Sequence, residues 1–237
     1  MSAGQSFNRF EKKYLVTKKE KDELVDFLTL HLKWDEFSID SAYTIYNVYY
    51  DTLDHNIIRQ SLDKPPYKAK LRVRSYRCPI GPEDAVYLEI KKKIQGKVTK
   101  RRLTMRYQDV EGFVFNGLKP DPNDFVSIQV LNEISYYLQC NQIIPKYYIA
   151  YERRALTDDT GLLRVTIDES IQYREDSVSL YQAGGKSLLP KDHYLIEIKS
   201  EHNFPLWLAH KLSTMGLFSR SFSKYGEAYR LTIQGDE

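Results

Sequence analysis

The stretch YKAKLRVRSY, residues 67–76, constrains the fold most, because it alternates cations with apolar residues. Lysine or arginine occupies every second position from 68 to 74, with small or aliphatic residues between them. In a β-strand, such a pattern places four cations on one face. Neighbouring cations are then roughly 7 Å apart and repel by about 2 kcal/mol at an effective dielectric constant of about 20. If this face is enclosed, it requires a polyanion to neutralise it.

The net charge of +3 conceals a strongly basic segment. Residues 64–106 contain fourteen Lys and Arg against three acidic residues, a local net charge of +11, so the remaining chain carries −8. Positive potential is therefore concentrated in one part of the chain, which favours an anionic ligand there.

The same alternation recurs elsewhere in the chain. Four segments place charged residues on one strand face: RFEKK (Arg9, Glu11, Lys13), YLEIKKK (Glu89, Lys91, Lys93), LRVTID (Arg164, Asp168) and YLIEIKS (Glu197, Lys199). In the last three, aliphatic residues lie opposite: Leu88 and Ile90, Val165 and Ile167, and Ile196 and Ile198. Half-exposed antiparallel strands often alternate in this way without any function. Here, however, the polar positions are almost all Lys, Arg or Glu. If helices cover the apolar faces, a sheet closed on itself encloses a cationic tunnel.

Chain length and periodicity predict an α+β fold in a single domain, residues 1–237, whose antiparallel sheet is either open or a closed antiparallel β-barrel with helices packed outside. Thr17 and Glu20 form a capping-box pattern at the start of the first helix. We expect strands at 7–16, 43–52, 67–76, 85–94, 97–107, 145–156, 162–176 and 193–201. We expect helices at 17–32, 55–63, 109–118 and 123–140, and a final amphipathic segment at 204–216.

Composition argues against several classes of protein. Cys78 and Cys140 form no CxxC pair and the five histidines are scattered, so any metal is expected to be held by oxygen ligands. No apolar run approaches the roughly 18 residues that span a bilayer, and the N-terminal residues lack the apolar core of a secretory signal. These features predict a soluble, cytoplasmic protein or a soluble part of something larger.

Nine short motifs together resemble a known family. In chain order they are RFEKKYLV, YYDT, KLRVRSY, YLEIKKK, TKRR, YERRAL, LRVTID, LIEIKS and SFSKY. Their number and order are similar to the catalytic domain of the vacuolar transporter chaperone (VTC) polyphosphate polymerases, which belong to the triphosphate tunnel metalloenzymes (CYTH-like superfamily). The resemblance runs through nearly the whole chain and implies the tunnel fold described above.

The resemblance also implies roles for individual residues. The residues expected to clamp the reacting phosphates are Arg72, Arg74, Arg153, Arg164 and Lys91. Further substrate contacts are expected from Lys13, Lys100, Arg102, Tyr151, Ser223 and Lys224, and from Lys70 in the opening row of cations. Arginine suits phosphate because its planar fork donates two parallel hydrogen bonds, whereas lysine supplies a point charge.

A metal ion, Mn²⁺ or Mg²⁺, is implied as cofactor, with Glu197 as its principal ligand. Glu89 and Glu11 are secondary candidates, and for both the alternative is an ion-pair role that spaces the cations apart. The superfamily's first-strand signature ExExK is Arg9, Glu11 and Lys13 here, so a cation replaces one carboxylate. In the last motif, Ser221 stands where a basic residue often precedes Phe-Ser-Lys, with Arg220 one place earlier.

The function implied is transfer of the terminal phosphoryl group of ATP to a growing polyphosphate chain. ATP and polyphosphate or pyrophosphate are then the ligands, and a membrane-protein partner not encoded in this chain fits the same picture. One alternative is a tunnel enzyme that hydrolyses triphosphate or polyphosphate. Another is a non-catalytic polyanion-binding module. The nineteen tyrosines could suit single-stranded nucleic acid, but those in YTIYNVYYDT mix both strand faces, so no nucleic acid is expected.

Overall fold

The computed structural model describes residues 10–122 and 124–235, and all strands within them belong to one antiparallel sheet. Its eight main strands follow the order β1 (Phe10–Thr17), β10 (His193–Ser200), β8 (Leu163–Arg174), β7 (Ile144–Thr157), β3 (Tyr43–Asp51), β4 (Tyr67–Ser75), β5 (Ala85–Ile94) and β6 (Lys97–Arg106). The two-residue strands β2 (Lys33–Trp34) and β9 (Lys186–Ser187) pair with β7 and β8. The α+β class and the antiparallel sheet are thus confirmed.

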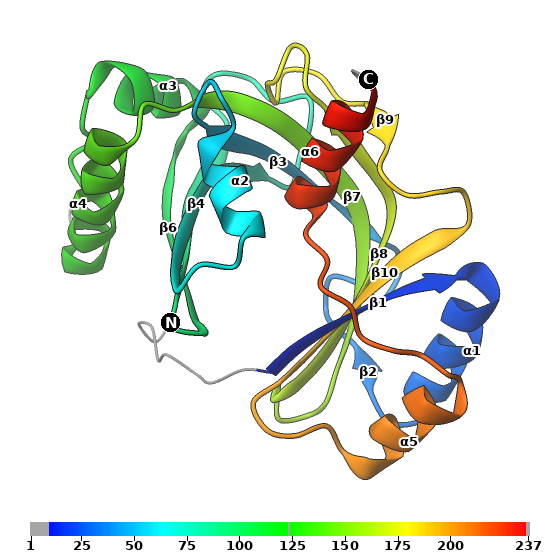
Figure 1. The fold of residues 1–237 in the computed structure, drawn as a ribbon. Coiled ribbons are helices and arrows are strands. Elements are labelled where there is room, and N and C mark those ends of the chain that lie inside the picture. Colours follow the sequence, from blue (N-terminus) through cyan, green and yellow to red (C-terminus); the bar gives the residue numbers. More distant parts are fainter. Residues whose placement is uncertain (1–9, 123, 236–237) are drawn as a thin grey trace.

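The sheet curves into a deep arch, with β4 to β6 in one limb and β1, β10 and β8 in the other (Figure 1). The ladder is continuous from β1 to β6, but among the described residues no pairing between β1 and β6 completes a circle. Closure of the barrel therefore stays a prediction. Part of the predicted first strand, residues 7–9, lies outside the described residues.

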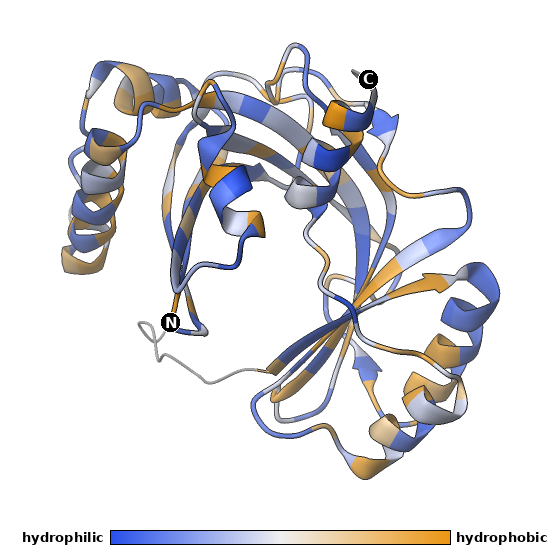
Figure 2. Ribbon diagram, in the orientation of Figure 1, coloured by the Kyte–Doolittle hydropathy of each residue, from blue (hydrophilic) through white to orange (hydrophobic). Residues whose placement is uncertain are grey.

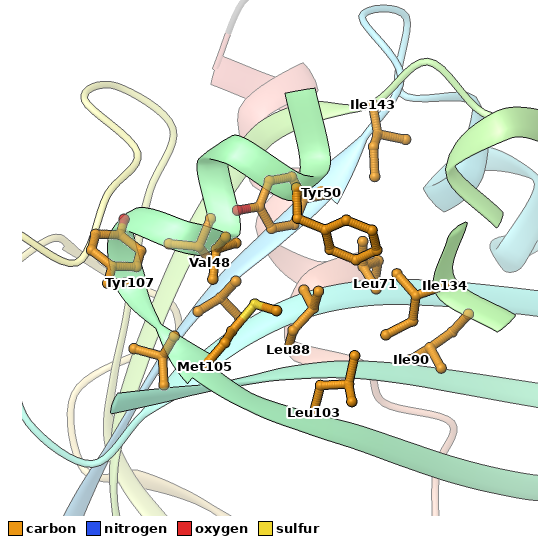
Figure 3. Packing of buried hydrophobic residues seen from close by; sticks show 14 of the residues in the cluster. Val48, Tyr50, Leu71, Leu88, Ile90, Leu103, Met105, Tyr107, Ile134 and Ile143 are labelled. Carbon is orange, nitrogen blue, oxygen red and sulfur yellow. The ribbon is translucent and has the colours of Figure 1, made fainter. Parts of the chain in front are cut away.

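The convex face of the β4–β6 limb and of the adjoining β3 is covered by α3 (Tyr107–Asn116) and α4 (Phe125–Cys140). The aliphatic residues that alternate with the cations point to this side. Leu71, Leu88 and Ile90 are fully buried there and pack with Ile134 of α4 (Figure 3). Figure 2 shows the resulting alternation of hydrophobic and hydrophilic residues along the strands.

The other limb is covered by α1 (Lys18–Leu28) and α5 (Leu206–Thr214). Leu24 and Leu28 of α1 and Leu208 of α5 pack against the apolar face of β1, β8 and β10. The predicted capping box is present, because the Thr17 hydroxyl accepts from the Glu20 backbone while the Glu20 carboxylate accepts from the Thr17 backbone. The helix ends at Leu28, four residues before its predicted end.

Two helices pack on the concave side: α2 (Asn56–Leu62) and α6 (Lys224–Gly235) (Figure 1). Asp51, the acidic residue of YYDT, is completely buried and holds both helices to the end of β3. Its carboxylate accepts from the backbone N–H groups of Ile57 and Ile58 and from the hydroxyl of Tyr225. Among the described residues, no helix is long and apolar enough to cross a membrane.

The convex packing predicts a large stability loss from truncation of its centre. Leu88→Ala is expected to lower the free energy of unfolding by about 2–5 kcal/mol, because it removes fully buried methyl groups and leaves a cavity. Leu53→Ala makes the same chemical change at a residue that is 78% exposed and is expected to cost less than about 0.5 kcal/mol. Chemical denaturation measures both, and equal losses would contradict this account of the core.

Candidate functional site

The strand register places the predicted cations on one face of the sheet. Residues paired directly across an antiparallel ladder point to the same side. The ladder pairs Lys70 with Lys91, Arg72 with Glu89, Glu89 with Arg102, Lys91 with Lys100, Lys13 with Glu197, and Arg153 with Asp168. Because the aliphatic neighbours of these residues lie under the outer helices, the charged side chains line the concave face.

Charged residues on the two limbs of the sheet interact electrostatically across this face. Lys91 lies on β5 and Glu11 on β1, near opposite ends of the strand order. Burial raises the pKa of Glu11, but nearby cations, with Lys91 first among them, reverse this and lower it. Curvature of the sheet therefore brings together charges that no single ladder connects.

One group of charges, the Glu89 cluster, consists of Glu89, Arg72, Arg74 and Lys100. The Glu89 side chain is 1% exposed, and its Oε2 accepts from Nε and a terminal nitrogen of Arg72 at 2.9 and 2.7 Å. Lys100 Nζ lies 3.4 Å from the other oxygen. Burial opposes ionisation of Glu89, but Arg72, Arg74 and Lys100 outweigh it and lower its pKa to about 2.

Arginines of this cluster are also held by neutral groups. Arg72 donates to the hydroxyl of Tyr49 at 2.8 Å, and Arg74 donates to the Asn47 side-chain oxygen at 3.0 Å. Arg74 additionally donates to the hydroxyl of Tyr151 at 3.3 Å. The guanidinium groups are thus fixed in orientation before any ligand binds, as a phosphate clamp requires.

A second group, the Asp168 cluster, consists of Asp168, Arg153, Lys224 and Tyr151. Arg153 forms a two-pronged pair with Asp168, at 2.5 and 2.7 Å, and Lys224 Nζ lies 2.5 Å from the same carboxylate. Arg153 and Lys224 also lie over the Tyr151 ring. Burial raises the pKa of Tyr151, but the charges of Arg153, Arg74 and Lys224 together lower it.

A third group, the Glu197 cluster, contains Glu197, Lys13, Lys199 and Glu11. Glu197 Oε1 lies 3.4 Å from both Lys13 and Lys224, and Lys199 lies 3.6 Å from Oε2. Lys13 also lies 3.2 Å from Glu11. Burial raises the pKa of Glu197, but Lys224, Lys13 and Lys199 hold it well below its usual value.

The carboxylates differ in how well they fit a metal ion. Glu197 and Glu11 lie on either side of Lys13, and one or two carboxylates completed by phosphate oxygens suit Mg²⁺ or Mn²⁺. Glu89 is held more tightly by cations, because it accepts from Arg72 at 2.7 and 2.9 Å, whereas the cations around Glu197 lie at 3.4 Å or more; this is in keeping with its ion-pair alternative. Within the described residues, no group of three or more acidic, Cys or His side chains could hold a metal. Metal binding there would therefore need oxygens from the substrate.

Among the described residues, Lys70 and Lys91 form no direct ion pair with a carboxylate; Asp51 and Glu11 act on them only from a distance. Burial, reinforced by other cations on the concave face, lowers the pKa of Lys70 to about 7. Burial likewise lowers the pKa of Lys91 to about 8, against the attraction of Glu11. Lys91 is nevertheless reachable by solvent, so protein surrounds its ammonium group without sealing it from an incoming anion.

The remaining predicted residues lie at the margins of these clusters. Arg164 pairs with buried Asp35 at 2.5 Å, and Arg102 lies over the Tyr87 ring at 4.7 Å. Ser223 accepts from the Gly226 backbone in the first turn of α6, which leaves its hydroxyl proton free to donate. Arg9, the departure in the first motif, lies outside the described residues.

Sequence reasoning did not select Asp168, although it placed this residue on the charged face beside Arg164. Its complete burial and its contacts with Arg153 and Lys224 become visible only once β7, β8 and α6 are assembled. Tyr49 and Asn47 were missed for a different reason, since uncharged residues gave no signal in a pattern of charges.

The assembled fold and its cationic concave face define a class: an α+β protein built on one curved antiparallel sheet. A Bacillus halodurans protein described as a candidate adenylate cyclase has a similar structure, with 16% identity, a TM-score of 0.55, and 90% of this chain and 92% of that chain covered. The Schizosaccharomyces pombe Mediator head module matches at 8% identity over 88% of this chain and 90% of that chain, and its TM-score of 0.40 is too low to indicate a shared fold. No curated protein matches at a significant level.

The VTC domain model matches residues 8–233, so the chain belongs to the VTC domain family. The sequence-based assignment is thereby confirmed over most of the chain.

The lysine pKa values predict that anion binding strengthens as pH falls. An anion favours the protonated lysines, so binding takes up protons wherever Lys70 and Lys91 are partly neutral in the free protein. From pH 9 to pH 6, the affinity for tripolyphosphate is expected to rise by roughly tenfold or more. Isothermal titration calorimetry measures this rise. Lys70→Met is expected to bind more weakly and to show a smaller rise, and the comparison cancels protonation of tripolyphosphate itself.

Lys70→Met is expected to weaken anion binding but to stabilise the free protein. The pKa of Lys70 is lower in the folded than in the unfolded chain, so between about pH 7 and pH 10.5 the unfolded chain binds more protons. Stability of the free protein therefore falls as pH drops through this window, and Lys70→Met is expected to raise the melting temperature at pH 7. If Lys70→Met left the pH dependence of tripolyphosphate binding unchanged, the role given to Lys70 would be contradicted.

Asp168→Asn is expected to destabilise the free protein by about 3–5 kcal/mol, because it removes the direct counter-charge of Arg153 and leaves buried Lys224 only the more distant Glu197, at 3.4 Å. Tripolyphosphate should then stabilise the variant more than the wild type, since the anion replaces the lost carboxylate. Thermal denaturation with and without tripolyphosphate measures both effects. Asp159→Asn is the control, because its ion pair with Lys33 is exposed and worth less than about 1 kcal/mol.

Proposed function

We propose that this protein is a polyphosphate polymerase that transfers the terminal phosphoryl group of ATP to the end of a phosphate chain. The observation that carries the proposal is the concave face itself, on which Arg72, Arg74 and Arg153 are pre-positioned by hydrogen bonds and ion pairs. Membership of the VTC domain family supports it. Closure of the sheet around the bound chain is part of the proposal.

Phosphoryl transfer needs little covalent work from a protein. It needs the attacking and leaving oxygens held in line and the charge on the transferred group neutralised. Arg72, Arg74 and Lys91 are proposed to bind the reacting phosphates from the β4–β6 limb, and Lys13 to neutralise the phosphate oxygens that face β1 in the other limb. A chain-terminal phosphate is itself the nucleophile, so no side chain has to form a covalent intermediate.

With Mn²⁺ or Mg²⁺ bound, the site would gain Lewis-acid neutralisation of the charge on the phosphates. Glu197 and Glu11 are the residues proposed to hold the metal ion. Lys224 and Lys13 keep Glu197 ionised, and therefore ready to bind a cation, at any pH near neutrality.

The proposal predicts that the purified protein with ATP and Mn²⁺ releases ADP and an acid-labile polymer. Arg72→Lys keeps the charge but loses the planar fork that contacts Glu89 and Tyr49, and is expected to lower kcat by about 100-fold. Separation of ADP, orthophosphate and polymer measures the products. Arg77→Lys is the matched control, since the Arg77 side chain is 80% exposed in the turn after β4.

The same measurement separates the alternatives. ADP with orthophosphate and no polymer would identify a hydrolase, in which water replaces the chain terminus as acceptor. Tight binding of polyphosphate without turnover of ATP would identify a polyanion-binding module.

A further inference from the structure

A row of aromatic rings borders the concave face at the end farthest from α2 and α6. Its members, the rim aromatics, are Phe37, Tyr43, Tyr76 and Tyr87. Successive rings contact one another, with centroid separations of 6.2 Å from Phe37 to Tyr43, 6.3 Å from Tyr43 to Tyr76 and 5.9 Å from Tyr76 to Tyr87. Phe37 and Tyr76 remain 67% and 46% exposed, so part of the row is free to contact a ligand.

The strand pattern and the ring contacts place the three tyrosines on the inward side. Tyr43 shares the parity of Asn47 on β3, and Tyr87 precedes Glu89 by two on β5. Tyr76 is the first residue after β4, and its ring lies between those of Tyr43 and Tyr87. Tyr87 is also the direct ladder partner of Arg74. The rings therefore continue the surface formed by the Glu89 cluster, roughly 7 Å further along each strand.

The opposite end of the same strands is covered. Asp51 at the end of β3 is bound to α2 and to Tyr225 of α6, and the Tyr49 and Tyr225 rings stack there at 4.9 Å. Tyr43 lies six residues before Tyr49, or about 20 Å along the strand. The rim aromatics thus lie at the end of these strands that α2 and α6 leave uncovered.

Arginines lie on both sides of the row. Arg102 lies over the Tyr87 ring at 4.7 Å. At the other end, the hydroxyl of Tyr43 is close enough to Arg153 and Arg164 for their charges to oppose the rise that burial gives its pKa. A ligand that fits this surface must combine a flat ring with negative charge next to it.

We propose that the rim aromatics form the base subsite of a nucleotide, with Tyr76 and Phe37 stacking on the purine while its phosphates extend toward Arg74 and Arg72. The inference rests on the proposed function and deepens it, because it assigns the donor's nucleoside to one end of the concave face. Flat rings carry no hydrogen-bond pattern specific to one purine, so ATP and GTP should bind within a few-fold of each other. A mononucleotide fits better than a nucleic acid strand, since the four rings form a single short row.

The test compares ATP with inorganic tripolyphosphate, which carries a phosphate chain but no base. Tyr76→Ala is expected to weaken ATP binding by about tenfold, the scale of one base–aromatic stack, and to leave tripolyphosphate binding within twofold. Tyr76→Phe keeps the ring and should restore ATP affinity. Titration calorimetry with Mn²⁺ present measures the affinity of the wild type and of each variant for tripolyphosphate and for a non-hydrolysable ATP analogue, which the proposed reaction cannot consume.

Tyr181→Ala is the matched control, because Tyr181 is also 46% exposed and also meets another tyrosine, Tyr107, edge-on. It should change neither affinity. Equal weakening of both ligands by Tyr76→Ala, or no weakening of either, would overturn the base subsite while leaving a phosphate-binding face intact. Failure of the wild type to bind either ligand would instead overturn the proposed function together with the subsite.

Discussion

Repulsion among the inward-facing cations is the constraint on which the rest of the structure depends. Three buried carboxylates offset it, and each serves several cations at once: Glu89 in the β4–β6 limb, Asp168 beside β7, and Glu197 on β10. Because the carboxylates are fewer than the cations around them, compensation is incomplete. The concave face is thereby stable enough to form and still positive enough to attract a polyanion.

The first two residues of α6 join the two halves of this face. Lys224 reaches Asp168 and Glu197 on one side, whereas Tyr225 contacts Asp51, Tyr49 and Lys70 on the other. A helix that begins here therefore sets how far apart the limbs stand. This explains why a lysine and a tyrosine follow one another at a position where both are buried.

Alternation along the strands was sufficient to predict which residues face inward, because the period of a β-strand fixes the face of every side chain. Apolar residues at helical spacing likewise predicted the outer helices, whose apolar stripes pack on the face of the sheet opposite the cations. Alternation could not predict that Lys91 lies near Glu11, since that proximity arises from curvature of the whole sheet. Nor could it reveal α6 on the concave side, because α6 is held there by contacts of its first two residues with Asp168 and Asp51, which are distant in sequence.

On the concave face, cations paired with carboxylates and cations without a carboxylate partner offer a ligand different properties. Arg72 and Arg153 are tied to carboxylates and keep a fixed geometry, which suits recognition of phosphate oxygens at defined positions. Lys70 and Lys91 have no bound carboxylate partner among the described ion pairs and carry lowered pKa values, so they gain most when an anion arrives. Under the proposed function, a phosphate chain that moves through the site would need both properties, because fixed arginines alone would hold each phosphate too firmly to release it. Lysines that lose charge as the anion leaves lower the barrier to that release.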